Sequence, residues 1–196
     1  FYSIYPLGFC GALYANPPPG RHDFFTRNPP QNRLAAISDS WLDHICSLGA
    51  NAVYFGPLFE STYHGYDTAD YFWVDRRLGT NGDFARLVEK MHRRGIKVVV
   101  DGVFNHVGRN FWAFADVQKN GQNSPYKDWF YLDFSRNNHF NDGFCYRGWE
   151  GCLDLVQLNL QNPAVKQHLI DAALYWIENF KIDGIRFDVA YMIDRQ

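Results

Sequence analysis

The alternation of short apolar strands with amphipathic helices constrains the fold of this chain more than any other feature. The clearest strand is the apolar run "GIKVVVD" (95–101). Runs rich in β-branched and aromatic residues predict further strands over 1–9, 51–59 and 184–189. Helical patterns lie between them, so the order is strand, helix, strand, helix, strand, insertion, helix, strand. This order is typical of a parallel α/β fold.

The predicted helices lie within 33–48, 81–95 and 162–180, and each carries end signals. Asn81 and Asn162 are N-cap residue types, Pro163 suits the first helical position, and Gly49 and Gly95 follow the last turns. The residues expected on the buried helix faces are Leu34, Ile37, Trp41, Ile45, Leu48, Phe84, Leu87, Val88, Met91, Val165, Leu169, Ala173, Trp176 and Phe180.

Three segments lack this regularity. Residues 17–31 are predicted to form a loop, and 60–75 a long aromatic and polar loop with a short strand near 71–74. Residues 109–159 are rich in Asn, Gly, Trp and Phe and show no long periodicity. A long irregular stretch inside a compact domain is usually functional or a small subdomain of its own.

Doubly wound sheets and eight-fold barrels both begin with this order of elements. No GxGxxG follows the first strand and no GxxxxGK[ST] occurs, which disfavours nucleotide-binding folds. We therefore predict an α/β fold of the (β/α)8 TIM barrel type. A complete barrel needs about 250 residues, so only the first four strand-helix units are expected here. The predicted division is 1–108 for the first three β/α units, 109–159 for an insertion after the third strand, and 160–196 for the helix and fourth strand.

The composition excludes several classes of function. Lys plus Arg number 19 and Asp plus Glu 21, so the net charge of -2 provides no basic field for nucleic acid. The apolar runs are short and broken by charges, so no membrane span is predicted. Aromatic residues make up 18% of the chain, and their flat faces suit sugar rings as well as a core.

The four cysteines indicate neither a zinc site nor a disulfide framework, because no CxxC pair occurs. Cys46 lies in a helical pattern and is expected to be a small buried hydrophobe, and only Cys145 and Cys152 are near enough in sequence for a local disulfide. This absence favours a cytoplasmic location. Because the chain opens with Phe1 rather than Met, we expect it to be cut from a longer protein, with any N-terminal targeting region outside it.

Conspicuous polar residues follow three of the predicted strands. In a barrel of this kind the carboxyl ends of the strands form the active site, so these side chains are expected to converge. They are His64, Tyr66, Asp67 and Asp70 after the second strand, Asp101, Asn105 and His106 after the third, and Arg186 and Asp188 on the fourth.

Arg186 and Asp188 point to the same face of the last strand, because strand residues alternate. Taken alone, they could be a structural ion pair at a sheet edge. Zinc-ligand spacing and a GxSxG nucleophile motif are both missing. Carboxylates, an arginine and aromatic rings in one cleft suit glycoside cleavage. Asp188 fits the nucleophile, because Arg186 would hold it ionised and oriented.

Several motifs resemble the α-amylase family of retaining glycoside hydrolases and transglycosylases. "DGVFNH" (101–106) and "GIRFD" (184–188) are similar to its first and second signature regions. "HGYDTADYFWVDRRLGT" resembles the family's loop after the second strand. "LDLVQLNLQNP" resembles its short signature before the fourth strand. "GRNFWAFADVQKNGQNSPYKDWF" is similar to the cyclomaltodextrinase and neopullulanase branch.

This resemblance implies a role for each matching residue. Asp188 would be the nucleophile and Arg186 its electrostatic partner, while Asp101 would brace Arg186. His106 would hydrogen-bond the sugar at the cleavage subsite and Tyr66 would stack on its ring. The resemblance also makes Asn105 a calcium candidate, although no carboxylate-rich calcium spacing is present; no other cofactor is expected. The insertion would be the small B domain that walls the substrate cleft.

The sequence departs from the family pattern in two ways. The general acid Glu and a further carboxylate lie on later strands of the family, beyond residue 196, so we expect these residues alone to be inactive. The visible acids do not match either position; they include Glu60, Glu89, Glu150 and Glu178. The second departure is "VAYM" (189–192), where Tyr191 and Met192 leave the acceptor-side specificity open.

The sequence favours an enzyme that hydrolyses an α-glucan, a maltooligosaccharide or a cyclodextrin. Two alternatives stay open: a transglycosylase of the same family, and a non-catalytic carbohydrate-binding or assembly protein derived from it. Intact Asp188, Arg186 and His106 disfavour the non-catalytic alternative. Open strand edges predict self-association of such a fragment.

Overall fold

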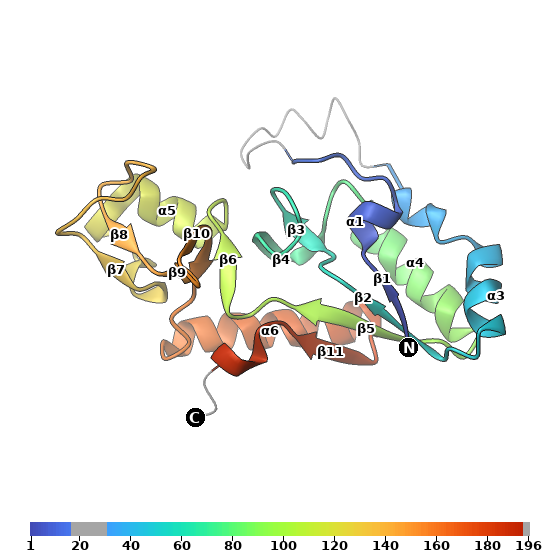
Figure 1. Cartoon of the computed structure of the whole chain (residues 1–196). Helices are drawn as coiled ribbons and strands as arrows, with labels where there is room; N and C mark the ends of the chain where they lie inside the picture. Colours follow the sequence, from blue (N-terminus) through green and yellow to red (C-terminus); the bar gives the residue numbers. More distant parts are fainter. Residues whose placement is uncertain (17–30, 194–196) are drawn as a thin grey trace.

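The centre of the protein is a four-stranded parallel sheet with the order β1-β2-β5-β11 (Figure 1). The computed structural model describes residues 1–16 and 31–193; the loop predicted over 17–31 therefore lies, apart from Gln31, outside the described residues. The strands are β1 (Tyr2–Ile4), β2 (Ala52–Phe55), β5 (Lys97–Gly102) and β11 (Gly184–Phe187). The predicted parallel α/β class is confirmed by these pairings.

The sheet register follows the apolar runs. Val53 and Phe55 of β2 lie opposite Val98 and Val100 of β5, and all four are fully buried. Such β-branched and aromatic pairs stabilise neighbouring strands by contact across the ladder. The same ladder continues to β11, whose Arg186 is the register partner of Asp101. The sheet thus brings together two charged residues from distant parts of the sequence.

The predicted helices form, with changes at their ends. They are α3 (Asp39–Ser47), α4 (Asn81–His92) and α6 (Pro163–Phe180), and a short 3-10 helix, η1 (Arg33–Ala36), precedes α3. The predicted single helix over 33–48 is wrong, because Ser38 accepts a hydrogen bond from the backbone N–H of Trp41 and starts a new helix. Asn162 caps α6 and Pro163 takes its first position, as predicted.

Thr80, not Asn81, is the N-cap of α4. Thr80 forms a capping box with Asp83: its hydroxyl accepts from the Asp83 N–H, and the Asp83 carboxylate accepts from the Thr80 N–H. Asn81 instead accepts from the N–H of Val74 and donates to the carbonyl of Phe72. The predicted cap was wrong because Asn81 is used to join the helix to the preceding strand.

Two predicted strands are shorter than expected. The first ends at Ile4, because Pro6 begins the four-residue helix α1 (Pro6–Phe9). The predicted strand 51–59 breaks after Phe55, and Pro57, which has no N–H to donate, lies in the gap. The chain then forms a hairpin from β3 (Phe59–Ser61) and β4 (Thr68–Val74), so the expected loop is largely antiparallel strand.

The segment after β5 has its own small sheets and lies beyond one end of the central sheet (Figure 1). The expectation of no long periodicity was wrong for the nine-residue helix in this segment, whose buried face is Ala113, Phe114 and Val117. The remaining elements are β6 (His106–Gly108), α5 (Trp112–Asn120), η2 (Gly121–Asn123), η3 (Lys127–Trp129), β7 (Leu132–Asp133), β8 (Cys145–Tyr146), β9 (Gly148–Trp149), β10 (Cys152–Gln157) and, after β11, η4 (Ala190–Met192). The division at 109 and 159 stays a prediction.

Helix α6 joins the central sheet to the hairpin through its buried face. The Trp176 ring stacks on Phe59 with centroids 4.0 Å apart, and its indole N–H donates to the carbonyl of Tyr71. Ala172 is fully buried on this face, whereas the predicted Ala173 is half-buried. Cys46 and Leu48 are exposed on α3, contrary to prediction, because Leu42 and Ile45 fill the buried side. All four cysteines are free.

Strand β11 is less buried than its apolar sequence predicts. Arg186 and Phe187 are exposed, because β11 is the last strand of the sheet among the described residues and only β5 pairs with it. Residues 1–16 and 31–193 include no helix with the length and apolarity needed to cross a bilayer.

Candidate active site

One arginine joins two carboxylates at the carboxyl ends of β5 and β11. Nη1 of Arg186 donates to Oδ1 of Asp101 at 2.9 Å and to Oδ1 of Asp188 at 2.7 Å. The strand register sets the first contact, and the Asp188 N–H donates to the carbonyl of Gly102. The backbone therefore holds Asp188 beside the arginine that was predicted to orient it.

Asp101 is the buried member of this group. Its carboxylate is fully shielded from solvent, and Oδ2 accepts a hydrogen bond from the Tyr54 hydroxyl at 2.8 Å. Burial raises the pKa of Asp101 above its ordinary value, although the hydrogen bonds from Arg186 and Tyr54 oppose that rise. Each oxygen of Asp101 thus has a partner within the protein, which suits a supporting carboxylate rather than a reacting one.

Arg186 stays a cation in this setting. Partial burial lowers its pKa, but the hydrogen bond and charge of Asp101 outweigh burial and leave the pKa above the ordinary value. Its side chain is 46% exposed and that of Asp188 15%. Of the two carboxylates, Asp101 and Asp188, only Asp188 can be reached by a ligand, and the positive charge of Arg186 lies against one of its oxygens.

The chain turns sharply just after Asp188. Val189 has a φ of 47°, in the left-handed region that a β-branched residue rarely adopts. Such strained positions are held by their surroundings and cluster at active sites. The turn follows Asp188, the first residue after β11, and leads directly into η4, so the carboxylate lies at the carboxyl end of the strand.

His106 is the first residue of β6, and it is buried. Its Nδ1 is 3.2 Å from the Asn105 amide nitrogen, while its buried Nε2 has no hydrogen-bond partner among the described residues. Burial lowers the pKa of His106 to about 4, with a further decrease from His64 and an opposing rise from Asp188. At neutral pH the ring is uncharged. If Asn105 donates to Nδ1, the proton lies on Nε2, which can donate to a ligand.

Tyr66 is half-buried beside the two carboxylates. Burial raises the pKa of its hydroxyl, and the charges of Asp101 and Asp188 raise it further. Its backbone N–H donates to Nδ1 of His64 at 3.2 Å, and the two rings are 6.2 Å apart. An aromatic ring therefore lies near the group formed by Arg186 and its carboxylates, and aromatic side chains are common in small-molecule sites.

Two other residues predicted at this site have structural roles. Asp67 accepts hydrogen bonds from the backbone N–H groups of Thr62, Tyr63, His64 and Gly65, at 2.7 to 3.1 Å. Asp70 accepts from the N–H of Phe72, and burial raises its pKa. The backbone thus uses both oxygens of Asp67 and one oxygen of Asp70, and the expectation that these carboxylates join the active site stays a prediction.

Sequence reasoning missed Tyr54 and Arg77. Tyr54 is the polar member of the apolar strand "AVYF", a signal that alternation could have supplied. Arg77 is buried and pairs with Asp75 at 2.7 Å, the same spacing of two residues that drew attention to Arg186 and Asp188. It contacts the loop that carries Tyr66, through the carbonyl of Tyr63, rather than Asp101 or Asp188.

A hydrogen bond crosses from η4 to the segment after β5. The Tyr191 hydroxyl donates to Oε1 of Glu150 at 2.8 Å, and both residues are exposed. This contact links the turn after Asp188 to the β9–β10 connection. Tyr191 lies three residues after Asp188, on the part of the chain where the acceptor-side residues were left open.

Metal ligation has little support in the described part of the chain. Within residues 1–16 and 31–193, no three His, Cys, Asp or Glu side chains gather in a way that could hold a metal ion. Asn105 is buried, and its amide nitrogen faces His106. Its calcium role stays a prediction.

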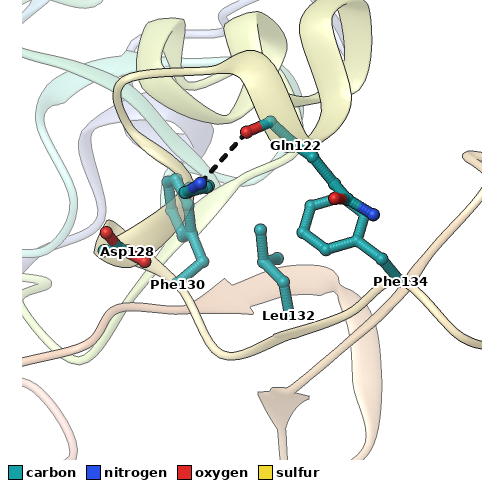
Figure 2. A pocket seen from close by; sticks show the side chains of 6 residues that line it. Gln122, Asp128, Phe130, Leu132 and Phe134 are labelled. Carbon is teal, nitrogen blue, oxygen red and sulfur yellow. Dashed lines mark hydrogen bonds between the residues drawn. The ribbon is translucent and has the colours of Figure 1, made fainter.

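A separate pocket of about 260 Å³ lies within the segment after β5 (Figure 2). Phe130, Leu132 and Phe134 form its apolar side, and Nζ of Lys127 donates to the carbonyl of Gln122 at its rim. It contains one carboxylate, Asp128. The group at Arg186 has an accessible carboxylate held by a fixed cation, so it is the stronger candidate for catalysis.

The fold and this group define an α/β catalytic domain with a carboxylate and arginine site at the strand ends. Comparison with known proteins identifies the family: the alpha amylase catalytic domain matches residues 33–196. A cyclomaltodextrinase from a Bacillus species is 40% identical over 207 residues, which cover 100% of this chain and 36% of that protein. The intracellular maltogenic amylase of Bacillus subtilis is 40% identical over 206 residues, with 99% and 33% covered.

A solved structure agrees. The ligand-free cyclic alpha-maltosyl-(1→6)-maltose hydrolase of Arthrobacter globiformis superposes with a TM-score of 0.80 and 39% identity, over 99% of this chain and 44% of that chain. That hydrolase has also been solved with cyclic alpha-maltosyl-(1→6)-maltose and with maltose. The chain belongs to the alpha-amylase family, and it is part of a catalytic domain of the TIM barrel type. It spans about a third of the length of these curated relatives.

Proposed function

We propose that this protein is an α-glucan-acting glycoside hydrolase that retains anomeric configuration. The observation that carries the proposal is the single nitrogen of Arg186 that bonds both Asp101 and Asp188. It gives one buried, braced carboxylate and one accessible carboxylate fixed by a cation. A retaining mechanism needs such an accessible nucleophile.

In the proposed first step, one oxygen of Asp188 attacks the anomeric carbon as the glycosidic bond breaks. The electron pair of that bond leaves on the departing sugar oxygen, which takes up a proton from a general acid. Water then attacks the same carbon and releases the Asp188 carboxylate, while the general acid, now deprotonated, takes up a proton from that water. No visible acid is assigned as the general acid, so these residues alone are expected to be inactive.

The neighbouring side chains have supporting roles in this proposal. The unpaired, neutral Nε2 of His106 donates to a sugar hydroxyl, and the ring of Tyr66 stacks on the sugar. Asp101 positions Arg186 without touching the sugar. The strands β1, β2, β5 and β11 are proposed to be the first four of the barrel, with the segment after β5 as the B domain.

The substrate is proposed to be a maltooligosaccharide or a cyclodextrin, as the names of the relatives suggest. Nucleic acid and membranes are not proposed as partners. One relative is named as intracellular, which supports a cytoplasmic location. The open edge of β11 and the exposed Ile170, Leu174 and Ile177 of α6 support self-association of residues 1–196 when they are produced alone.

The test is an assay of the intact protein with maltohexaose and a cyclodextrin, next to its Asp188→Asn variant. Release of reducing sugar by the unmodified protein alone supports the proposal, and equal release by both excludes Asp188 as nucleophile. Transfer of the sugar to a second sugar instead of water is the alternative that these residues leave open. Products longer than the substrate would indicate transfer rather than hydrolysis.

A further inference from the structure

Two tyrosine rings are held out to solvent near the candidate active site. Tyr14 is 87% exposed and Tyr63 is 48% exposed. Their ring centroids are 5.9 Å apart and their planes are inclined by 51°. Exposed single hydrophobic residues are common, but these two rings contact each other and neither belongs to the hydrophobic core. Their positions therefore call for a separate reason.

A buried arginine fixes the backbone of both tyrosines. Nη1 of Arg77 donates to the carbonyl oxygens of Leu13, Tyr14 and Tyr63, at 3.2, 3.2 and 2.6 Å. The Arg77 side chain is 2% exposed, and its charge is balanced by Asp75. Burying a charge is costly unless it is paired and fully hydrogen-bonded. The hydrogen bonds of the Arg77 guanidinium therefore fix the backbone at Tyr14 and Tyr63, whose rings lie outside the core.

The Tyr63 loop leads directly to Tyr66, which lies near Asp101 and Asp188. Tyr63 precedes Tyr66 by three residues, which can span at most about 10 Å, and Tyr66 is near enough to Asp101 and Asp188 for their charges to raise its pKa. The Asp67 carboxylate clamps this loop by accepting the Tyr63 N–H at 2.7 Å. The two exposed rings are thus connected, through a loop held by Asp67, to Tyr66 of the candidate site.

We propose that Tyr14 and Tyr63 form an additional subsite, which binds glucosyl units beyond the one that Asp188 attacks. This inference rests on the proposed function. Sugar rings present C–H faces that pack on aromatic rings without charged partners, and the nearby charges of Arg77 and Asp75 neutralise each other. A protein partner is a poorer fit, because two rings offer far less area than a stable protein interface buries.

The test compares a short and a long sugar. Dissociation constants for maltose and maltohexaose are measured by calorimetry in an Asp188→Asn background of the intact protein, which prevents turnover. Tyr14→Ala and Tyr63→Ala are each expected to weaken maltohexaose binding about 3- to 10-fold. Maltose binding should change less than the error of the measurement. Tyr14→Phe and Tyr63→Phe keep the rings and should bind both sugars like the parent.

Two further variants and three contrary outcomes make the test decisive. Trp73→Ala removes another exposed ring, from β4, and should leave both constants unchanged. Tyr66→Ala should weaken the binding of both sugars, because Tyr66 lies near Asp101 and Asp188. Unchanged maltohexaose binding in Tyr14→Ala and Tyr63→Ala would overturn the subsite, as would equal loss for both sugars. If the parent binds neither sugar, the proposed function fails. If the parent binds both sugars and the tyrosine variants bind like it, only the subsite fails.

Discussion

Arg186 and Asp101 are register partners on β11 and β5, and Nη1 of the arginine lies 2.9 Å from Oδ1 of the carboxylate. The same nitrogen bonds Asp188 at 2.7 Å. The orientation of the proposed nucleophile therefore depends on a buried carboxylate 85 residues before the arginine. A change at Asp101 should reach the reaction only through Arg186, whereas a change at Asp188 should remove the reaction itself.

Asp188→Asn should abolish activity while leaving the fold intact. The amide keeps the shape of the side chain and can still accept from Arg186, but it cannot attack the anomeric carbon. The rate of maltohexaose hydrolysis by the intact protein should fall by at least about a thousandfold. Asp43→Asn, on the exposed face of α3, is the matched control and should keep full activity. Residual activity within tenfold of the parent would remove Asp188 from the nucleophile role.

Asp101→Asn should lower kcat more than it raises KM. Loss of the charge weakens the hydrogen bond to Arg186, which then holds Asp188 less firmly. Hydrogen bonds to charged groups contribute about 1.5–3 kcal/mol, so kcat should fall about 10- to 100-fold. Steady-state kinetics with maltohexaose measure both constants. An increase in KM with kcat unchanged would mean that Asp101 binds the sugar directly and does not position Arg186.

The fold was largely predictable because its strands are local apolar signals. Val98 and Val100 lie in a run that no helix pattern competes with, and the Asn162–Pro163 cap is read from two adjacent residues. The single helix over 33–48 was wrong because the Ser38 cap competes with an apolar spacing that continues through it. Cys46 was misplaced because periodicity alone did not fix which side of α3 faces the core.

Most members of the candidate site were predictable, but by different routes. The strand-end rule found Asp101 and Arg186, whereas only the family resemblance predicted that Asp101 braces Arg186, because their contact depends on the β5–β11 register, which no local pattern contains. The rule also selected Asp67, because a carboxylate in a polar loop gives no sign that four backbone N–H groups will occupy it. Tyr54 was missed because its partner, Asp101, lies on the neighbouring strand β5.

The protein should lose stability as the pH falls from 6.5 towards 4, partly because of His106. The folded protein holds this ring neutral, with a pKa of about 4 against an ordinary value of 6.5. Between these values the unfolded chain takes up a proton that the folded protein excludes. The free energy of unfolding therefore decreases as the pH falls. The contribution is full above pH 6.5 and its loss is complete below about 4.

Urea unfolding at pH 7.5 and pH 4.5 measures this effect. His106→Gln should reduce the loss between the two pH values by about 2 kcal/mol. A part of the loss should remain, because burial also lowers the pKa of His168. His139→Gln, at an exposed position, is the matched control and should keep the whole loss. If His106→Gln loses as much stability as the parent, His106 is not the group that titrates.

Arg77→Ala should destabilise the protein far more than removal of a surface ion pair. Arg77 and Asp75 are both nearly inaccessible to solvent, so the variant leaves a buried carboxylate without its cation and three backbone carbonyls without their donor. Breaking such a pair costs about 3–5 kcal/mol. Urea unfolding should show this decrease, while Arg93→Ala, which removes the exposed pair with Glu89, should leave the midpoint nearly unchanged. Equal midpoints for the two variants would show that the Arg77 network does not hold the Tyr14 and Tyr63 segments together.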